Sequence, residues 1–172
     1  MSYFEYNAYK LSYNLSPYIH TTLKLSPNNV TTIKLIFSII FFILCLYNYY
    51  NRKLSISIMC LISWYITFLC DYLDGTIARR YNLTSEFGYY YDHICDYILL
   101  LILILLNILY RFNKNITIFV TIIYIICGYY TEIKQKDHNK KILFYMKYFD
   151  MGMLLFLYIP IIMSYHVLDD IY

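Results

Sequence analysis

The sequence predicts an all-α polytopic membrane protein with five transmembrane helices, or six, behind an amino-terminal juxtamembrane segment. Three observations predict this class. Of the 172 residues, 60% are hydrophobic and only 15% are charged, whereas charged residues make up about 25% of a soluble domain. Segments such as 36–46 and 98–106 carry almost none of the polar stripe that a helix of a soluble bundle needs. Charged residues are also absent from five long stretches, residues 35–51, 54–70, 97–110, 115–131 and 151–168.

Each charge-free stretch is close to the length of a membrane span, which takes roughly 20 apolar residues as a helix. We therefore expect five spans, at about 33–51, 54–73, 92–110, 115–131 and 145–168. Residues 142–172 are too few for two full spans, but they have room for one span and a half-inserted piece. Residues 28–172 would then form the transmembrane domain.

Residues 1–27 are polar and aromatic and contain no apolar run of the length that a signal peptide requires. We interpret them as a juxtamembrane segment. The spacing of apolar side chains within them is compatible with an amphipathic helix on the membrane surface, and an irregular tail is the alternative.

The basic residues near the predicted spans indicate the orientation of the chain. Nine fall on one side and four on the other, which places the amino terminus and residues 74–91 in the cytoplasm. The nine are Lys10, Lys24, Lys34, Arg79, Arg80, Lys134, Lys136, Lys140 and Lys141, and the four are Arg52, Lys53, Arg111 and Lys114. The basic run 134–141 reflects this topology, and we do not expect nucleic acid as a partner.

Two pairs of aspartates flank the loop between the second and third predicted spans. Asp71 and Asp74 are spaced i, i+3 at the end of one helix, and Asp92 and Asp96 are spaced i, i+4 at the start of the next. Each pair therefore shares one helix face. Because a short connection makes the two helices antiparallel neighbours, we expect all four carboxylates to converge.

Four converging carboxylates need a compensating charge near a membrane. One aspartate within a span costs about 2.5–3.5 kcal/mol on insertion scales, and a cation can remove most of that cost. Oxygen ligands favour Mg²⁺ or Mn²⁺, which also bind substrate phosphates. The small residues Gly75 and Ala78 share a face with Asp71, and Gly88 lies one turn before Asp92, so there is room for a ligand or for close contact between helices. The cluster therefore predicts metal-dependent phosphate chemistry at the membrane surface.

The segment from Asp71 to Asp96 follows the pattern D-x2-D-G-x2-A-R-x8-G-x3-D-x3-D at all eight fixed positions. This pattern resembles the signature of the CDP-alcohol phosphotransferases, also called class-I CDP-alcohol phosphatidyltransferases. The upstream residues 27–31, Pro-Asn-Asn-Val-Thr, resemble the PN-x2-T sequence at the start of that family's first helix. The resemblance is close over roughly residues 27–110.

The resemblance implies a role for each matching residue. Asp71, Asp74 and Asp92 would be metal ligands for two ions, Mg²⁺ or Mn²⁺, and Asp96 would be the general base and a further ligand. His93 is either an auxiliary base or a helix-face residue that points away from the site. The nucleotide would be held by Asn28, Thr31, Gly75, Ala78, Arg79 and Ser85.

Members of this family move a phosphoryl-linked group from a CDP-alcohol to an acceptor alcohol, lipid or small, and release CMP. The resemblance further implies a homodimer of six-helix subunits among membrane lipids, whereas we count five helices here. Residues 92–96, Asp-His-Ile-Cys-Asp, resemble the D-H-G-C-D run of the choline and ethanolamine phosphotransferases. Residues 84–88, Thr-Ser-Glu-Phe-Gly, resemble the S-x-F-G of synthases that use CDP-diacylglycerol. The short chain favours the second group.

Two other functions are compatible with clustered aspartates in a membrane. One is a catalytically inactive family member that acts as a scaffold or binds cations. The other is an intramembrane prenyltransferase, although its acidic motifs lie on distant helices of a much longer chain. Here Asp74 and Asp92 are only 18 residues apart.

Overall fold

The computed structural model describes residues 3–110, and the regular structure in that part of the chain is helical. The elements are α1 (Tyr3–Pro17), the short π-helix η1 (Tyr18–Thr22), α2 (Pro27–Asn51), α3 (Leu54–Arg80) and α4 (Glu86–Leu109). Three described helices are long and apolar enough to cross a bilayer, over Pro27–Asn51, Leu54–Arg80 and Glu86–Leu106. The prediction of an all-α integral membrane protein is thus confirmed for this part. The expected spans at 115–131 and 145–168, and a sixth helix, lie outside the described residues.

Helix α1 is tied to the end of α3 by Arg80. The Arg80 guanidinium donates to the carbonyl oxygen of Tyr13 at 2.7 Å and to Oγ of Ser16 at 3.0 Å. Its Cζ also lies 4.2 Å from the centre of the Tyr13 ring, a cation–π arrangement. The amino-terminal segment is therefore helical over Tyr3–Pro17, and its contact with a membrane surface stays a prediction.

Helix α2 begins six residues before the predicted span because its first turn is capped. Ser26 accepts a hydrogen bond from the Asn29 N–H through Oγ at 3.2 Å, and Pro27 occupies the first helical position. Both features favour a helix start. The helix ends at Asn51, after which Arg52 adopts a left-handed conformation with φ 47°.

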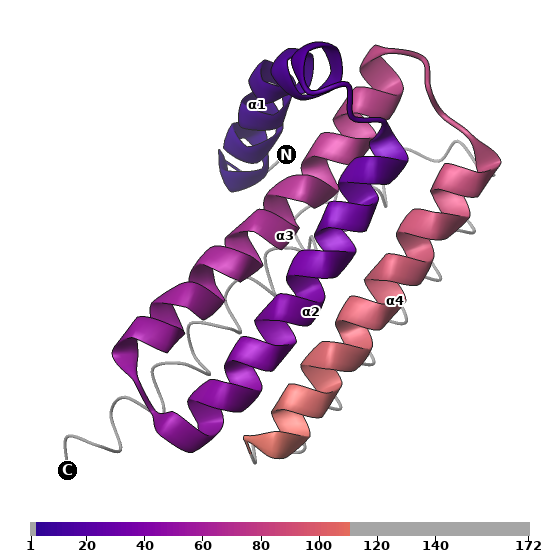
Figure 1. Cartoon of the computed structure of the whole chain (residues 1–172). Helices are drawn as coiled ribbons and strands as arrows, with labels where there is room; N and C mark the ends of the chain where they lie inside the picture. The colour runs from indigo at the N-terminus through magenta and orange to yellow at the C-terminus, as the bar shows by residue number, and fades with distance from the viewer. Residues whose placement is uncertain (1–2, 111–172) are drawn as a thin grey trace. The chain divides into compact units, whose positions relative to one another are not determined.

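Helices α2 and α3 form an antiparallel pair, joined by Arg52 and Lys53 alone (Figure 1). At mid-length the rings of Phe41 and Trp64 pack with their centroids 5.2 Å apart. Near the α2–α3 connection, Asn48 donates to Oγ of Ser57 at 3.0 Å. Close packing and such hydrogen bonds hold helices together in lipid, where there is no hydrophobic drive between them.

Helix α4 runs beside α2, as Figure 1 shows, and meets it through polar side chains. One contact joins the hydroxyl oxygens of Thr32 and Tyr91 at 3.0 Å. Helix α3 continues seven residues past its predicted end at 73, and α4 starts at Glu86, six before its predicted start at 92. The helices are longer than predicted because hydropathy marks only the residues that fit the apolar layer of the membrane, and a helix can extend beyond that layer. The four aspartates therefore lie within helices rather than at their ends.

Candidate active site

Three of the four aspartates meet around a buried lysine. The Nζ atom of Lys34, on α2, lies 2.6 Å from a carboxylate oxygen of each. The Lys34 side chain is only 1% exposed, whereas the carboxylate side chains are about one third to one half exposed. Helices α2, α3 and α4 each contribute to this cluster, whose acidic members are Asp71, Asp92 and Asp96.

Asp74 lies one turn from Asp71 on α3 but has different partners. It is only 6% exposed. One oxygen, Oδ2, accepts from the Thr31 hydroxyl at 2.7 Å, and the other, Oδ1, accepts from the Gly75 N–H at 2.5 Å. The structure thus brings together two residues of the predicted site, Thr31 and Asp74, that are 43 positions apart in the sequence.

The surroundings of the Lys34 ammonium fit a divalent cation. Three carboxylate oxygens at one distance from one positive centre form a hard, oxygen-only donor set of the kind that Mg²⁺, Mn²⁺ and Ca²⁺ prefer. His93 adds a nitrogen, because one ligand atom each from Asp92, His93 and Asp96 lie within 4.8 Å of one another. The buried Nδ1 of His93 has no hydrogen-bond partner within residues 3–110. The residues present can therefore hold a metal.

The predicted nucleotide residues of α3 lie next to these acids. The Arg79 side chain is exposed and folds back by one turn, so that a Cβ placed on Gly75 would lie 3.1 Å from its Nη1. Ala78, between them in sequence, is half-buried and accepts from the Leu83 N–H through its carbonyl at 2.9 Å. Because Gly75 has no side chain, the guanidinium of Arg79 can lie against Gly75, one turn earlier on the same helix.

The predicted nucleotide residues at the starts of α2 and α4 meet at Gly88. Ser85 caps α4, because its Oγ accepts from the Gly88 N–H at 3.0 Å. A Cβ on Gly88 would lie 2.9 Å from Oδ1 of Asn28 and 3.0 Å from Oγ of Ser85. Glycine at this position thus leaves room for the side chain of Asn28 from α2, and Asn28 and Ser85 lie beside each other there.

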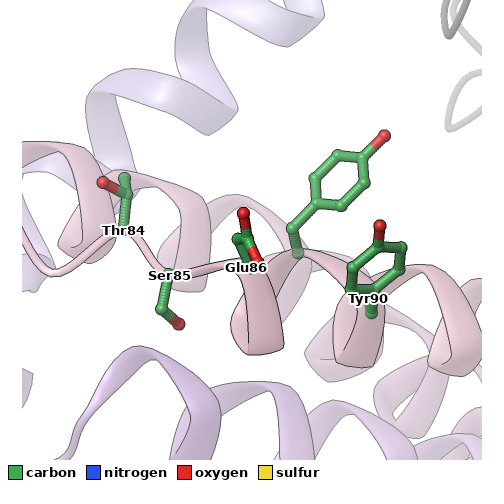
Figure 2. A pocket seen from close by; sticks show the side chains of 5 residues that line it. Thr84, Ser85, Glu86 and Tyr90 are labelled. Carbon is green, nitrogen blue, oxygen red and sulfur yellow. The ribbon is translucent and has the colours of Figure 1, made fainter.

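An open hollow of about 490 Å³ lies beside the start of α4. Figure 2 shows Thr84, Glu86 and Tyr90 on one side of the chain there, with Ser85 pointing the opposite way. The lining consists of Thr84, Ser85, Glu86, Tyr89 and Tyr90 and includes none of the four aspartates. The hollow is therefore a different feature from the cluster around Lys34.

A comparison with protein families identifies the family to which the chain belongs. The family model described as CDP-alcohol phosphatidyltransferase matches residues 24–166, which includes all of α2, α3 and α4. The chain belongs to the CDP-alcohol phosphatidyltransferase family. Comparisons with curated proteins and with solved structures gave no match. As a CDP-alcohol phosphatidyltransferase, the chain is an integral membrane transferase of a metal-dependent family that takes a CDP-alcohol donor and an alcohol acceptor.

One expectation for this CDP-alcohol phosphatidyltransferase was wrong. Lys34 was counted among the basic residues that indicate orientation, but it lies within α2 with its ammonium buried against carboxylates. Without it the count is eight against four, so the predicted orientation is unchanged. A signal was present in the sequence, since Lys34 falls inside the predicted span 33–51, where a charge is expected to have a partner.

Replacing Thr31 with valine should destabilise the CDP-alcohol phosphatidyltransferase. The change keeps the shape but removes the hydroxyl that donates to the buried Asp74, and a buried acceptor left unpaired costs about 1–3 kcal/mol. Thermal unfolding of the purified protein measures the effect. Thr32→Val is the matched control, because Thr32 is exposed and bonds to Tyr91 near the surface. Equal stability of the two variants would contradict the role of the Thr31–Asp74 contact.

Alanine at the two glycines of the CDP-alcohol phosphatidyltransferase signature should have opposite effects on stability. Both changes gain helix propensity, up to about 1 kcal/mol. At Gly75 the new methyl group meets only the flexible end of Arg79, so we expect little loss. At Gly88 it meets the short side chains of Asn28 and Ser85, and overpacking of this kind costs about 1–3 kcal/mol. The measurement is the melting temperature, and Gly88→Ala as stable as Gly75→Ala would show that Asn28 and Ser85 leave room for a methyl group at residue 88.

Proposed function

We propose that this enzyme transfers a phosphatidyl group from CDP-diacylglycerol to a small alcohol at the cytoplasmic membrane face, with two Mg²⁺ or Mn²⁺ ions, and releases CMP. The observation that carries metal-dependent phosphotransfer is the convergence of three carboxylates from two helices on one buried positive charge. The Ser-x-Phe-Gly sequence at residues 85–88 supports the donor. The excess of basic residues on one side of the predicted spans supports the cytoplasmic location.

The proposed roles follow from where the acids lie. Asp71, Asp92 and Asp96 would hold the ions, and Asp74, fixed by Thr31, would supply the remaining carboxylate. Bound ions would stabilise the charge on the diphosphate and on the leaving CMP. His93 stands beside Asp92 and Asp96, which supports a part in metal binding or proton transfer.

The transfer itself breaks one bond and forms another. The acceptor hydroxyl oxygen forms a bond to the phosphorus of the phosphatidyl group, and the bond from that phosphorus to the bridging oxygen of CMP breaks with its electron pair. An alcohol is a weak acid, so the attack needs a group that accepts its proton. Asp96 takes that proton in our proposal.

The nucleotide would be held by residues at the end of α3 and at the starts of α2 and α4. Arg79 is exposed beside Gly75 and offers a planar fork to the diphosphate. Asn28 and Ser85 meet at Gly88, at the start of α4. We further propose that residues 28–172 act as one transmembrane domain and that the enzyme is a homodimer, as the family resemblance implies.

A second donor class, CDP-choline or CDP-ethanolamine with diacylglycerol as acceptor, is favoured by residues 92–96. This run differs from D-H-G-C-D at Ile94, and Ile94 is 55% exposed, whereas Cys95 is only 1% exposed. The difference thus lies at a position that is away from the buried face of α4. It therefore weighs little against the second class.

A lipid-product assay by mass spectrometry separates these functions. The purified full chain is incubated with Mn²⁺ and each donor, paired with inositol, glycerol 3-phosphate, serine or diacylglycerol. We expect products only from CDP-diacylglycerol with a small alcohol. Products from CDP-choline or CDP-ethanolamine would show that the enzyme uses this other class of donor. Nucleotide binding without turnover of any donor would favour an inactive scaffold, and the family match leaves the prenyltransferase without support.

A further inference from the structure

We propose that the Lys34 ammonium is a built-in counter-cation that occupies the place of a divalent ion, so that a metal binds to this enzyme by displacing it. The proposal rests on the metal-dependent function proposed above. It assigns to Lys34 a positioning role in the metal-free protein and predicts that the lysine and the metal compete for the same oxygens.

The geometry carries the competition. Nζ of Lys34 is 2.6 Å from one oxygen of each of three carboxylates. A metal that binds these three oxygens must be close to all of them at once, at about 2.0–2.6 Å for Mg²⁺ or Ca²⁺, and that position is the one Nζ fills. Two cations cannot share it, so the arrangement is either lysine-bound or metal-bound.

The charges explain why a lysine is present. Without a cation, the three carboxylates that α3 and α4 bring together would repel one another. Lys34 is buried to 1% exposure, so the carboxylates take the place of water around its ammonium. Asp74 is also close by on α3, with its oxygens held by Thr31 and Gly75. The metal-free protein can therefore hold its helices together without an ion.

The direction in which Lys34 can leave is set by its helix. Side chains on an α-helix lean toward its amino terminus, and one and two turns before Lys34 lie Thr31 and Asn28. These residues are on the predicted nucleotide side of the cluster. A displaced ammonium would thus remain near the diphosphate of a bound donor and exchange carboxylate oxygens for phosphate oxygens.

Mn²⁺ binding to the purified full chain, without nucleotide or acceptor, tests the competition. Free Mn²⁺ is followed by electron paramagnetic resonance in wild type, in Lys34→Met and in Lys10→Met. Methionine keeps the unbranched side chain but removes the charge, and Lys10 is an exposed lysine of α1 that serves as the matched control. We expect at least tenfold tighter Mn²⁺ binding in Lys34→Met and an unchanged affinity in Lys10→Met.

The thermal stability of the same variants gives a second readout. Lys34→Met should melt at a lower temperature than wild type in chelator, and Mn²⁺ should raise its melting temperature by more than it raises that of wild type. A simple buried ion pair predicts a different result, in which Lys34→Met is less stable with and without metal and binds Mn²⁺ no more tightly. That result would overturn the proposal.

A measurement on wild type covers the case in which Lys34→Met does not fold. Reductive methylation of lysines, read by mass spectrometry, should label Lys34 at least tenfold faster when Mg²⁺ is present, whereas Lys10 should react equally with and without it. An unchanged rate at Lys34 would show that the ammonium stays in place and would contradict the proposal. None of these measurements uses the donor. If the enzyme turns over a CDP-alcohol with metal but gives the contrary results here, this inference is wrong and the proposed function still holds.

Discussion

Asp96→Asn is expected to lower turnover of the enzyme by about 10²–10⁴-fold, the usual contribution of a positioned general base. The amide has nearly the same shape as the carboxylate, but it cannot take the proton of the acceptor hydroxyl. It also removes one of the three charges that face Lys34. The measurement is the rate of CMP release with Mn²⁺ and the donor that the product assay identifies.

The control for this variant is Glu86→Gln, an acid on the same helix. Glu86 is exposed in the first turn of α4 and lines the open hollow rather than the aspartate cluster. Its turnover should stay within about twofold of wild type, because surface changes away from a site have small effects. If the turnover of Asp96→Asn were also within about twofold of wild type, Asp96 would not be the general base and would only be a structural partner of Lys34.

Arg79→Lys is expected to raise the KM for the CDP-alcohol about tenfold to a hundredfold. The guanidinium offers a planar fork to a diphosphate, and lysine replaces it with a single point charge. A hydrogen bond to a charged group contributes about 1.5–3 kcal/mol, and each 1.4 kcal/mol is about tenfold in affinity. Initial rates over a series of donor concentrations give the KM of each variant.

The neighbouring Arg80 is a matched control because its guanidinium is engaged elsewhere. It contacts Tyr13 and Ser16 of α1, so Arg80→Lys should lower the melting temperature and leave the KM for the donor near that of wild type. Equal rises in KM for Arg79→Lys and Arg80→Lys would refute the assignment of Arg79 to the diphosphate. They would then point to a general requirement for guanidinium groups at the end of α3.

The spacing of the aspartates is a local property, and the sequence was sufficient for it. Residues at i, i+3 and i, i+4 share a helix face whatever the rest of the chain does, so the pairing of Asp71 with Asp74 and of Asp92 with Asp96 could be predicted. The helix ends could not be predicted from hydropathy, because Ser26 and Pro27 start α2 before the apolar stretch begins. These capping residues can be recognised in the sequence, but they lie before the apolar stretch that hydropathy identifies.

Lys34 and Asp74 show what required the tertiary structure. From the sequence, Asp74 resembled the other three acids, and Lys34 was one of nine basic residues that indicated orientation. In the structure, Lys34 contacts three carboxylates and Asp74 is paired with Thr31. Which side chain of α2 points at α3 and α4 depends on the rotation of α2 about its own axis. That rotation is set by packing along its length, as between Phe41 and Trp64.

The sequence by itself determined the membrane class, the acidic signature and, through that signature, the family. Each of these follows from composition or from the order and spacing of residues along the chain, which the packing of the helices does not alter. Only the tertiary structure decided which groups meet across helices and that a lysine of α2 contacts three of the four aspartates. The reason is physical, since contacts between helices depend on their relative rotation and depth, and those are fixed by the packing of the whole bundle.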